Sequence, residues 1–221
     1  MKKCAFIASG GGMKAYAFHV GVLQALEDCS FRRVMWNEPL STADERPHEE
    51  VQIGTYIGSS AGACVSGAAV FLETIDEMKA VIGIGKSHHP VIDMRTMVRK
   101  PKLWPPWKVA GLTNVTGMEN FFKKTFLEQN FSNITPEVFV VATQLNSSRK
   151  VIFGPRDSGA QTDYNPYVAY YNDIPMYKAV SASMAVPGIF EPYAIENPSS
   201  GERIYYIDGE VRETLSAHIA Q

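Results

Sequence analysis

One stretch of small residues, Gln52–Gly67, constrains the fold of this chain more than any other. A short β-type run at 56–57 leads into Gly-Ser-Ser-Ala-Gly at 58–62, and a small-residue run typical of a buried helix follows over 63–71. The pattern Gly-x-Ser-x-Gly between a strand and a helix predicts a nucleophile elbow, which is a sharp turn that exposes its central serine. We therefore expect Ser60 at the tip of a strained turn.

The two glycines of this pattern, Gly58 and Gly62, have a steric purpose. A Cβ atom at either position would collide with the neighbouring strand or helix, so the turn needs glycine on both sides. Peptide dipoles at the N-terminus of the following helix favour negative charge that develops beside Ser60. The pattern therefore places a candidate nucleophile next to an electropositive helix end.

Composition indicates one ordinary globular domain over residues 1–221. Hydrophobic residues make up 45% of the chain and charged residues 20%, as in typical soluble domains. A net charge of −2 gives no basic footprint for nucleic acid. The 3 cysteines have no CxxC spacing, which disfavours a zinc site or a disulfide framework and fits a reducing compartment.

No targeting or membrane segment is expected. The apolar run Cys4–Ala8 is shorter than the about 7 residues that a signal peptide needs. No stretch of the sequence approaches the ~18 apolar residues of a membrane span. We therefore expect a cytoplasmic protein.

Periodicity predicts alternating strands and helices. Asp208 ends the last predicted strand, and in open α/β sheets active sites gather at the carboxyl ends of strands. Thr116, with Glu119 three residues further on, predicts a capped helix start. The predicted strands are 4–8, 56–57, 137–142, 150–153 and 203–207, and the predicted helices are 17–26, 63–71, 71–84, 117–127 and 176–184.

The glycine-rich turn Ser9–Lys14 follows the first predicted strand. It is not a dinucleotide fingerprint, because Ala15 stands where no glycine recurs, and it lacks the Gly-Lys-Ser/Thr of a phosphate loop. Consecutive N–H groups of Gly10, Gly11 and Gly12 at a helix start can instead form an anion-binding nest. In an acyl hydrolase such a nest serves as the oxyanion hole.

A serine nucleophile needs a base, and the histidines of this chain are poorly placed to supply one. The chain has 5 histidines. Only His218 follows Asp208, as the order serine, acid, histidine would require. The better prediction is a dyad in which Asp208 contacts Ser60 directly, with burial raising the pKa of the carboxyl. The other four histidines are His19, His48, His88 and His89.

Four blocks together resemble the patatin-like phospholipase family. They are Ser9–Lys14, residues 58–62, Ala182–Pro192 and Asp208–Glu210. The resemblance implies a three-layer α/β/α sandwich with a mainly parallel central sheet. It also implies hydrolysis of phospholipid or lysophospholipid acyl esters by a Ser–Asp dyad, without a metal or an organic cofactor.

Carried over by position, the resemblance makes Ser60 the nucleophile and Asp208 its partner. The three glycines at 10–12 become the oxyanion loop, and Lys14 stands at the family's basic position after them. Gly58 and Gly62 support the turn.

The sequence departs from the family's pattern in three places. Ala15 replaces a glycine that often follows the basic residue. Glu210 replaces the commoner glycine or alanine after Asp-Gly, which leaves a charge beside the base. Only 13 residues follow Asp208, so we expect either a shortened fold or a chain that continues beyond Gln221.

Two other functions compete with lipid hydrolysis. Acyl transfer on a related fold usually places a histidine beside the nucleophilic serine, whereas Ser59 and Ala61 flank Ser60 here. A lipid-binding protein with a relic site would have no need of Ser60 and Asp208.

The segment Pro101–Lys108 carries two tryptophans beside basic residues. It could contact a membrane surface peripherally, but a packed loop is the favoured interpretation.

Overall fold

The computed structural model describes residues 3–40, 51–84, 111–113, 115–155, 167–196 and 201–220. These residues form a mixed α/β fold with a mainly parallel central sheet, which confirms the fold class that the sequence predicts. The elements in chain order are β1 (Lys3–Ala8), α1 (Gly12–Asp28), β2 (Phe31–Arg33), β3 (Val51–Ser59), α2 (Ala61–Phe71), α3 (Ile75–Ala80), β4 (Gly111–Thr113), α4 (Thr116–Thr125), η2 (Phe131–Asn133), β5 (Glu137–Gln144), β6 (Arg149–Phe153), β7 (Val168–Tyr171), α5 (Met176–Ser183), β8 (Gly188–Phe190), β9 (Tyr193–Glu196), β10 (Arg203–Asp208), η4 (Gly209–Val211) and η5 (Ala217–Ala220).

The described strands form one eight-stranded sheet and one two-stranded sheet of β4 and β8. In the large sheet β1, β3 and β5 are adjacent and parallel, β2 pairs in parallel with β3, and β6 pairs in parallel with β7. Antiparallel pairing joins β5 to β6, β5 to β10, and β9 to β10. The chain therefore reverses direction only after the three central strands are in place.

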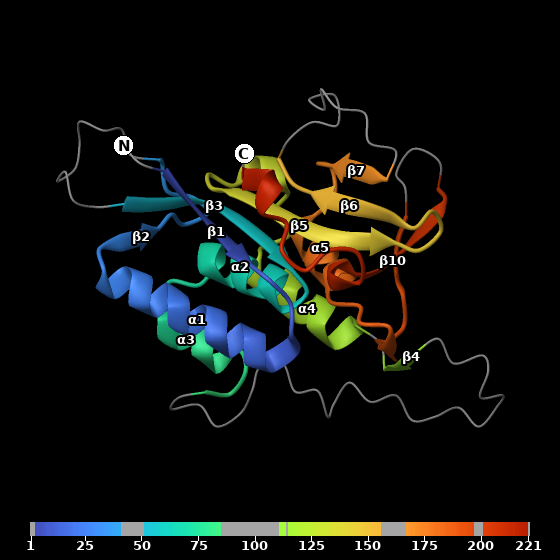
Figure 1. Ribbon diagram of the computed structural model, residues 1–221, viewed down its shortest axis with the longest axis horizontal. Coiled ribbons are helices and arrows are strands. Elements are labelled where there is room, and N and C mark those ends of the chain that lie inside the picture. The colour runs from blue at the N-terminus through green and yellow to red at the C-terminus, as the bar shows by residue number, and fades with distance from the viewer. Residues whose placement is uncertain are drawn as a thin grey trace.

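All five described α-helices pack in one hydrophobic cluster with the same face of the sheet. The reason is topological: β1, β3 and β5 are laid down in one direction, and right-handed crossovers then put their connections on one side. Figure 1 shows α1 to α4 along that side of the strands. Alternate residues of β5, such as Val138, Val140 and Ala142, face this cluster.

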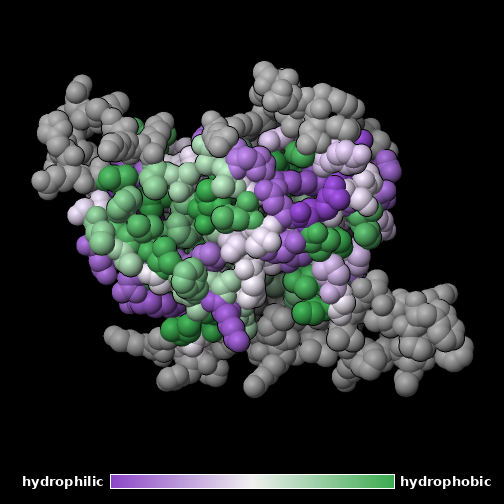
Figure 2. Space-filling view, viewed as in Figure 1, coloured by the Kyte–Doolittle hydropathy of each residue, from purple (hydrophilic) through white to green (hydrophobic). Residues whose placement is uncertain are grey.

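The opposite face of the sheet has a smaller cluster. Ile57, Phe139, Val141 and Ile152 pack there against Ile219 of the C-terminal turn η5. In the view of Figure 2, apolar side chains cover the area over β1 and β3, and hydrophilic ones gather over β5 and β6. In the described part of the chain, η5 is the element that packs on this second face.

Strand β5 brings the ends of β3 and β10 together. Ser59, the last residue of β3, pairs with Val141, and Asp208, the last residue of β10, pairs with the next residue, Ala142. Since β6 occupies the other edge of β5 at these positions, β3 and β10 share one edge and meet end to end. The sequence-based expectation was that Ser60 and Asp208 lie at the carboxyl ends of parallel strands. In the structure the two carboxyl ends meet because β10 runs antiparallel to β5.

Two local predictions were wrong. The helix expected over 71–84 forms only as α3, and its start is the capping box of Thr74 with Glu77. The helix α4 begins at Thr116 itself, after Val115, and has no side-chain cap, so Thr116 is not the N-cap. The same Thr-x-x-Glu spacing occurs in both places, and only the first adopts the extended backbone that a cap requires.

Some sequence predictions concern residues outside the described ranges. These are the tryptophan segment Pro101–Lys108 and the histidines His48, His88 and His89. Within the described ranges, no helix has the length and apolar character needed to cross a bilayer.

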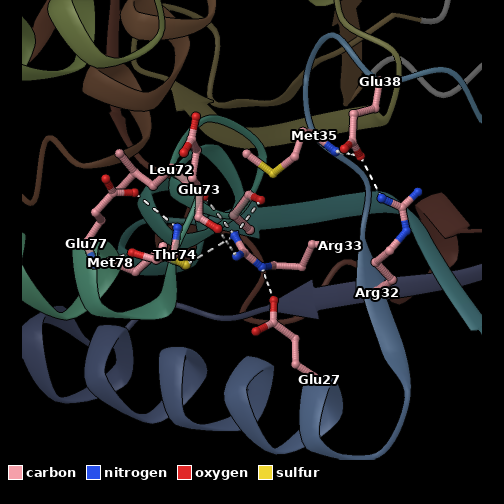
Figure 3. A network of polar contacts seen from close by, with 11 residues as sticks. Glu27, Arg32, Arg33, Met35, Glu38, Leu72, Glu73, Thr74, Glu77 and Met78 are labelled. Carbon is pink, nitrogen blue, oxygen red and sulfur yellow. Dashed lines mark hydrogen bonds and ion pairs between the residues drawn. The ribbon is translucent and has the colours of Figure 1, made fainter.

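A buried arginine ties the first helix to the end of α2 (Figure 3). The Arg33 side chain is 5% exposed and donates to Glu27 at 2.5 Å. It also donates, at 3.0 Å each, to three main-chain carbonyls at and after the C-terminus of α2, those of Ala69, Leu72 and Glu73. A cation at this helix end complements the dipole of α2 and satisfies carbonyls that the helix leaves unpaired.

Replacing Arg33 should therefore be costly. We expect Arg33→Met to lower the free energy of unfolding by about 3 kcal/mol, because three carbonyls at this helix end, one of them buried, and the Glu27 carboxylate lose their donor. Arg32→Met on the same strand is the matched control. Its ion pair with Glu38 is partly exposed, so its loss should cost less than about 1 kcal/mol. Urea denaturation followed by circular dichroism measures both, and equal losses would contradict the assignment.

Candidate active site

Ser60 lies between β3 and α2 in a conformation that non-glycine residues rarely adopt. Its φ is 54° and its ψ −122°, and such backbone strain costs on the order of 1–3 kcal/mol. The N–H groups of Ala63 and Cys64 bond to the Ser60 carbonyl at 3.0 and 3.2 Å, which starts the helix directly at the serine. The side chain therefore stands at the N-terminus of a fully buried helix.

Gly58 and Gly62 lie where the elbow packs closely against neighbouring main-chain atoms. A Cβ on Gly58 would overlap the Gly62 carbonyl, and a Cβ on Gly62 would overlap the carbonyl of Ala8 in β1. Main-chain atoms cannot move aside as a flexible side chain can. Both positions therefore need glycine for close approach rather than for a positive φ.

A second serine holds the strained turn in place. The Ser183 hydroxyl accepts the Ser60 N–H at 2.8 Å and donates to the Val141 carbonyl at 2.6 Å. It thereby bridges α5, the elbow and β5, and it is fully buried. Ser183 lies in one of the four family blocks, but its role could not be predicted, because a single sequence has no signal for a bridge between three distant elements.

Asp208 is brought beside Ser60 by the end-to-end junction on β5. Its Oδ1 accepts the Glu210 N–H at 2.9 Å, which caps the turn η4 and orients the carboxylate. Gly209 makes the approach possible, since a Cβ there would overlap the Val141 carbonyl and lie 2.5 Å from the Ser59 hydroxyl.

The environment of Asp208 favours its neutral form. Burial raises the pKa of the Asp208 carboxyl. The neighbouring Ser60 hydroxyl and the Glu210 N–H lower it by less, so the pKa stays above its ordinary value. A raised pKa makes the carboxylate a stronger base than an exposed aspartate. The Asp208 carboxyl is therefore buried beside the Ser60 hydroxyl and is less acidic than the carboxyl of an exposed aspartate.

The glycine loop lies beside the elbow. Gly11 and Gly12 have φ of 131° and 65°, and Gly12 begins α1. Their N–H groups have no hydrogen-bond partner among the described residues, so they are available to an anion. The Gly10 N–H, by contrast, donates to the Glu210 carboxylate at 2.7 Å. Lys14 is exposed on the first turn of α1.

The two histidines in the described ranges, His19 and His218, have their polar contacts with groups other than Ser60. His19 is buried and its Nε2 lies 3.0 Å from the Ser9 carbonyl; burial lowers the pKa of its imidazole. His218 lies 3.4 Å from Glu213 and 3.3 Å from the Lys150 ammonium, next to the cluster on the second face. Neither arrangement resembles a base for Ser60.

An apolar cavity opens at Ser60. Its volume is about 140 Å³, close to that of engineered cavities of about 150 Å³ that bind benzene. Met13 and Ile189 line it and are also substantially exposed, so they form its mouth. The remaining lining residues are Gly12, Tyr16, Ala61, Cys64, Ile82, Met118, Met184, Val186 and Phe190.

Cys64 is the other nucleophilic side chain in this cavity. It is fully buried, and burial raises the pKa of its thiol far above the ordinary value. The thiolate is the reactive form of cysteine, so Cys64 contributes an apolar wall rather than a nucleophile.

The fold and the site define the class, an α/β protein with an elbow serine in the wall of an apolar cavity. The model of the patatin-like phospholipase family matches residues 7–220, so the chain belongs to this family, as its sequence motifs indicate. Proteins of the family generally hydrolyse lipid esters. No curated protein matched the sequence.

The Ser183 bridge gives a testable stability difference. We expect Ser183→Ala to lower the free energy of unfolding by about 2–4 kcal/mol, because a buried N–H and a buried carbonyl each lose a partner worth about 1–3 kcal/mol. Ser181→Ala is the control: this serine is equally buried, and its hydroxyl only adds to the helix's own bond with the Tyr177 carbonyl. Similar urea midpoints for the two variants would contradict the bridging role.

Proposed function

We propose that this protein is a serine acyl hydrolase of the phospholipase A or lysophospholipase type. One observation carries the proposal: Ser60 stands on a strained turn at an apolar cavity and contacts a buried carboxylate, Asp208, whose pKa is raised. The family's general activity on lipid esters supports the reaction class, and the Ser–Asp dyad is the finer part of the proposal.

The proposed reaction has two halves. In the first, Asp208 takes the hydroxyl proton as Ser60 Oγ attacks the acyl carbonyl, and the carbonyl oxygen becomes an oxyanion. The tetrahedral intermediate collapses, the C–O bond to the leaving alcohol breaks, and that alcohol receives the proton from Asp208. In the second half, water repeats the attack on the acyl-serine and releases the fatty acid.

We assign the oxyanion to the N–H groups of Gly11 and Gly12. Among the described residues these two N–H groups have no hydrogen-bond partner, and Gly12 lines the same cavity as Ser60. The N-terminus of α2 adds its dipole at the same place. Gly10 belongs to the loop, but its own N–H is already bound to Glu210.

The cavity indicates which part of the substrate it holds. A volume of about 140 Å³ accepts roughly six carbons, by comparison with cavities that hold benzene. The polar headgroup would remain outside the mouth formed by Met13 and Ile189. These exposed apolar side chains fit an enzyme that takes its substrate from a lipid surface.

Covalent labelling tests the nucleophile. A fluorophosphonate probe should modify Ser60 and should leave Ser59 and Ser66 unmodified, because only Ser60 faces both the cavity and Asp208. Peptide mapping by mass spectrometry identifies the labelled residue. Wild type should also hydrolyse a short p-nitrophenyl ester, and Ser60→Ala should not. Labelling that persists at another serine in Ser60→Ala would overturn the proposal.

Asp208→Asn should separate catalysis from stability. Loss of a general base should reduce kcat by about 10²–10⁴-fold, while the folded protein becomes at least as stable as wild type at pH 7. The reason is that Asp208 holds its proton more tightly in the folded state than in the unfolded chain. Ionisation therefore opposes folding at pH values above the raised pKa.

The pH dependence checks the sign of this effect. The stability advantage of Asp208→Asn should shrink as the pH falls through the raised pKa, and it should vanish below about 3.9, the ordinary pKa of aspartate. Urea denaturation of wild type and of Asp208→Asn at several pH values measures this difference in the free energy of unfolding. A variant that is inactive and also unstable at pH 7 would indicate a structural role instead.

A further inference from the structure

Glu210 stands where the family's motif commonly has glycine or alanine, and its side chain is packed into the site. Its Oε1 accepts the Gly10 N–H at 2.7 Å. A Cβ added to Gly10 would lie 2.5 Å from Glu210 Cγ and 2.8 Å from Ser60 Cβ. Glu210, the glycine loop and the nucleophile are therefore in direct contact, although Glu210 and Gly10 lie at opposite ends of the sequence.

The peptide unit between Ser9 and Gly10 has side-chain partners for both its carbonyl and its N–H group. The carbonyl of Ser9 and the N–H of Gly10 belong to the same planar peptide. His19 lies 3.0 Å from that carbonyl, and Glu210 accepts that N–H. The two side chains, from α1 and η4, therefore fix the orientation of this peptide from both of its edges.

The loop needs such an anchor because it is made of glycine. Gly11 and Gly12 both adopt positive φ, and glycine loses more conformational freedom on ordering than any other residue. The orientation of the Ser9–Gly10 peptide sets the direction in which the following N–H groups point. An error of about 1 Å in a positioning group can cost on the order of 10²-fold in rate.

We propose that Glu210 is a positioning residue that, by holding the Ser9–Gly10 peptide together with His19, aims the Gly11 and Gly12 N–H groups at the oxyanion. This inference rests on the proposed hydrolase function and adds a residue to it. Glu210 acts through the loop, since it does not line the cavity, whereas Gly12 and Ser60 do.

The charge of Glu210 has close neighbours that bear on this role. Burial raises the pKa of the Glu210 carboxyl most strongly, the Gly10 N–H lowers it, and the nearby Asp208 carboxylate raises it further. A carboxylate without a hydrogen-bond donor would repel the negative charge of a nearby oxyanion. Here one of its oxygens is bound to a main-chain N–H, and the gain from an ordered loop outweighs the repulsion in our proposal.

Three variants test the proposal. Glu210→Ala should lower kcat on the order of 10–100-fold with little change in KM, because the cavity keeps its shape. Glu210→Gln should recover much of the rate, since its amide oxygen can still accept the Gly10 N–H. Arg212→Ala, an exposed neighbour of η4, should match wild type. The assay is p-nitrophenyl ester hydrolysis, with circular dichroism to verify folding.

An inhibitor pair isolates the oxyanion. An alkyl trifluoromethyl ketone forms a hemiketal oxyanion on the serine, whereas the matching secondary alcohol only fills the cavity. Glu210→Ala should weaken the ketone about as much as it lowers kcat, and it should leave binding of the alcohol unchanged.

Two results would overturn the inference. One is a Glu210→Ala enzyme with wild-type kcat and ketone affinity, and the other is a faster enzyme, which would mean that the carboxylate opposes the oxyanion. Failure of the underlying function is distinguishable from both, because wild type would then neither hydrolyse the ester nor be labelled at Ser60.

Discussion

The site depends on one strand edge, that of β5, which β3 and β10 share end to end. Main-chain pairing places Ser59 against Val141 and Asp208 against Ala142, so two consecutive positions on a buried strand bring Asp208 next to the elbow. Side-chain flexibility plays little part in this arrangement. The contact between Ser60 and Asp208 is in that sense a product of sheet register.

Val141 of β5 also helps to stabilise the strained backbone of the elbow. The Val141 carbonyl accepts the Ser183 hydroxyl, which in turn accepts the N–H of the strained residue Ser60. At the other end of α2, the Arg33 cation holds the last carbonyls of the helix. Ser60 therefore stands at the start of a helix that is fixed at both ends by buried polar side chains.

Sequence reasoning succeeded where the physics is local. The strand–glycine–helix patterns predicted the elements around Gly58 and Gly62, and four short blocks sufficed to identify the family that the family model then confirmed. It failed at Thr116, because two stretches share the Thr-x-x-Glu spacing and only backbone conformation distinguishes them. Ser183 and Glu210 could not be assigned from sequence, since their partners are distant in the chain and the pairing exists only after folding.

The order of the strands along the chain has a consequence for synthesis. Ser60, the helix α2 that follows it and the glycine loop all belong to the first third of the sequence, whereas Asp208 belongs to the last strand of the sheet. A ribosome-bound chain that has not yet released β10 has Ser60 without the carboxyl of Asp208 beside it. In the proposed mechanism such a nascent or prematurely ended chain is inert towards membranes, and the ability to cleave lipids is acquired only when the final strand docks.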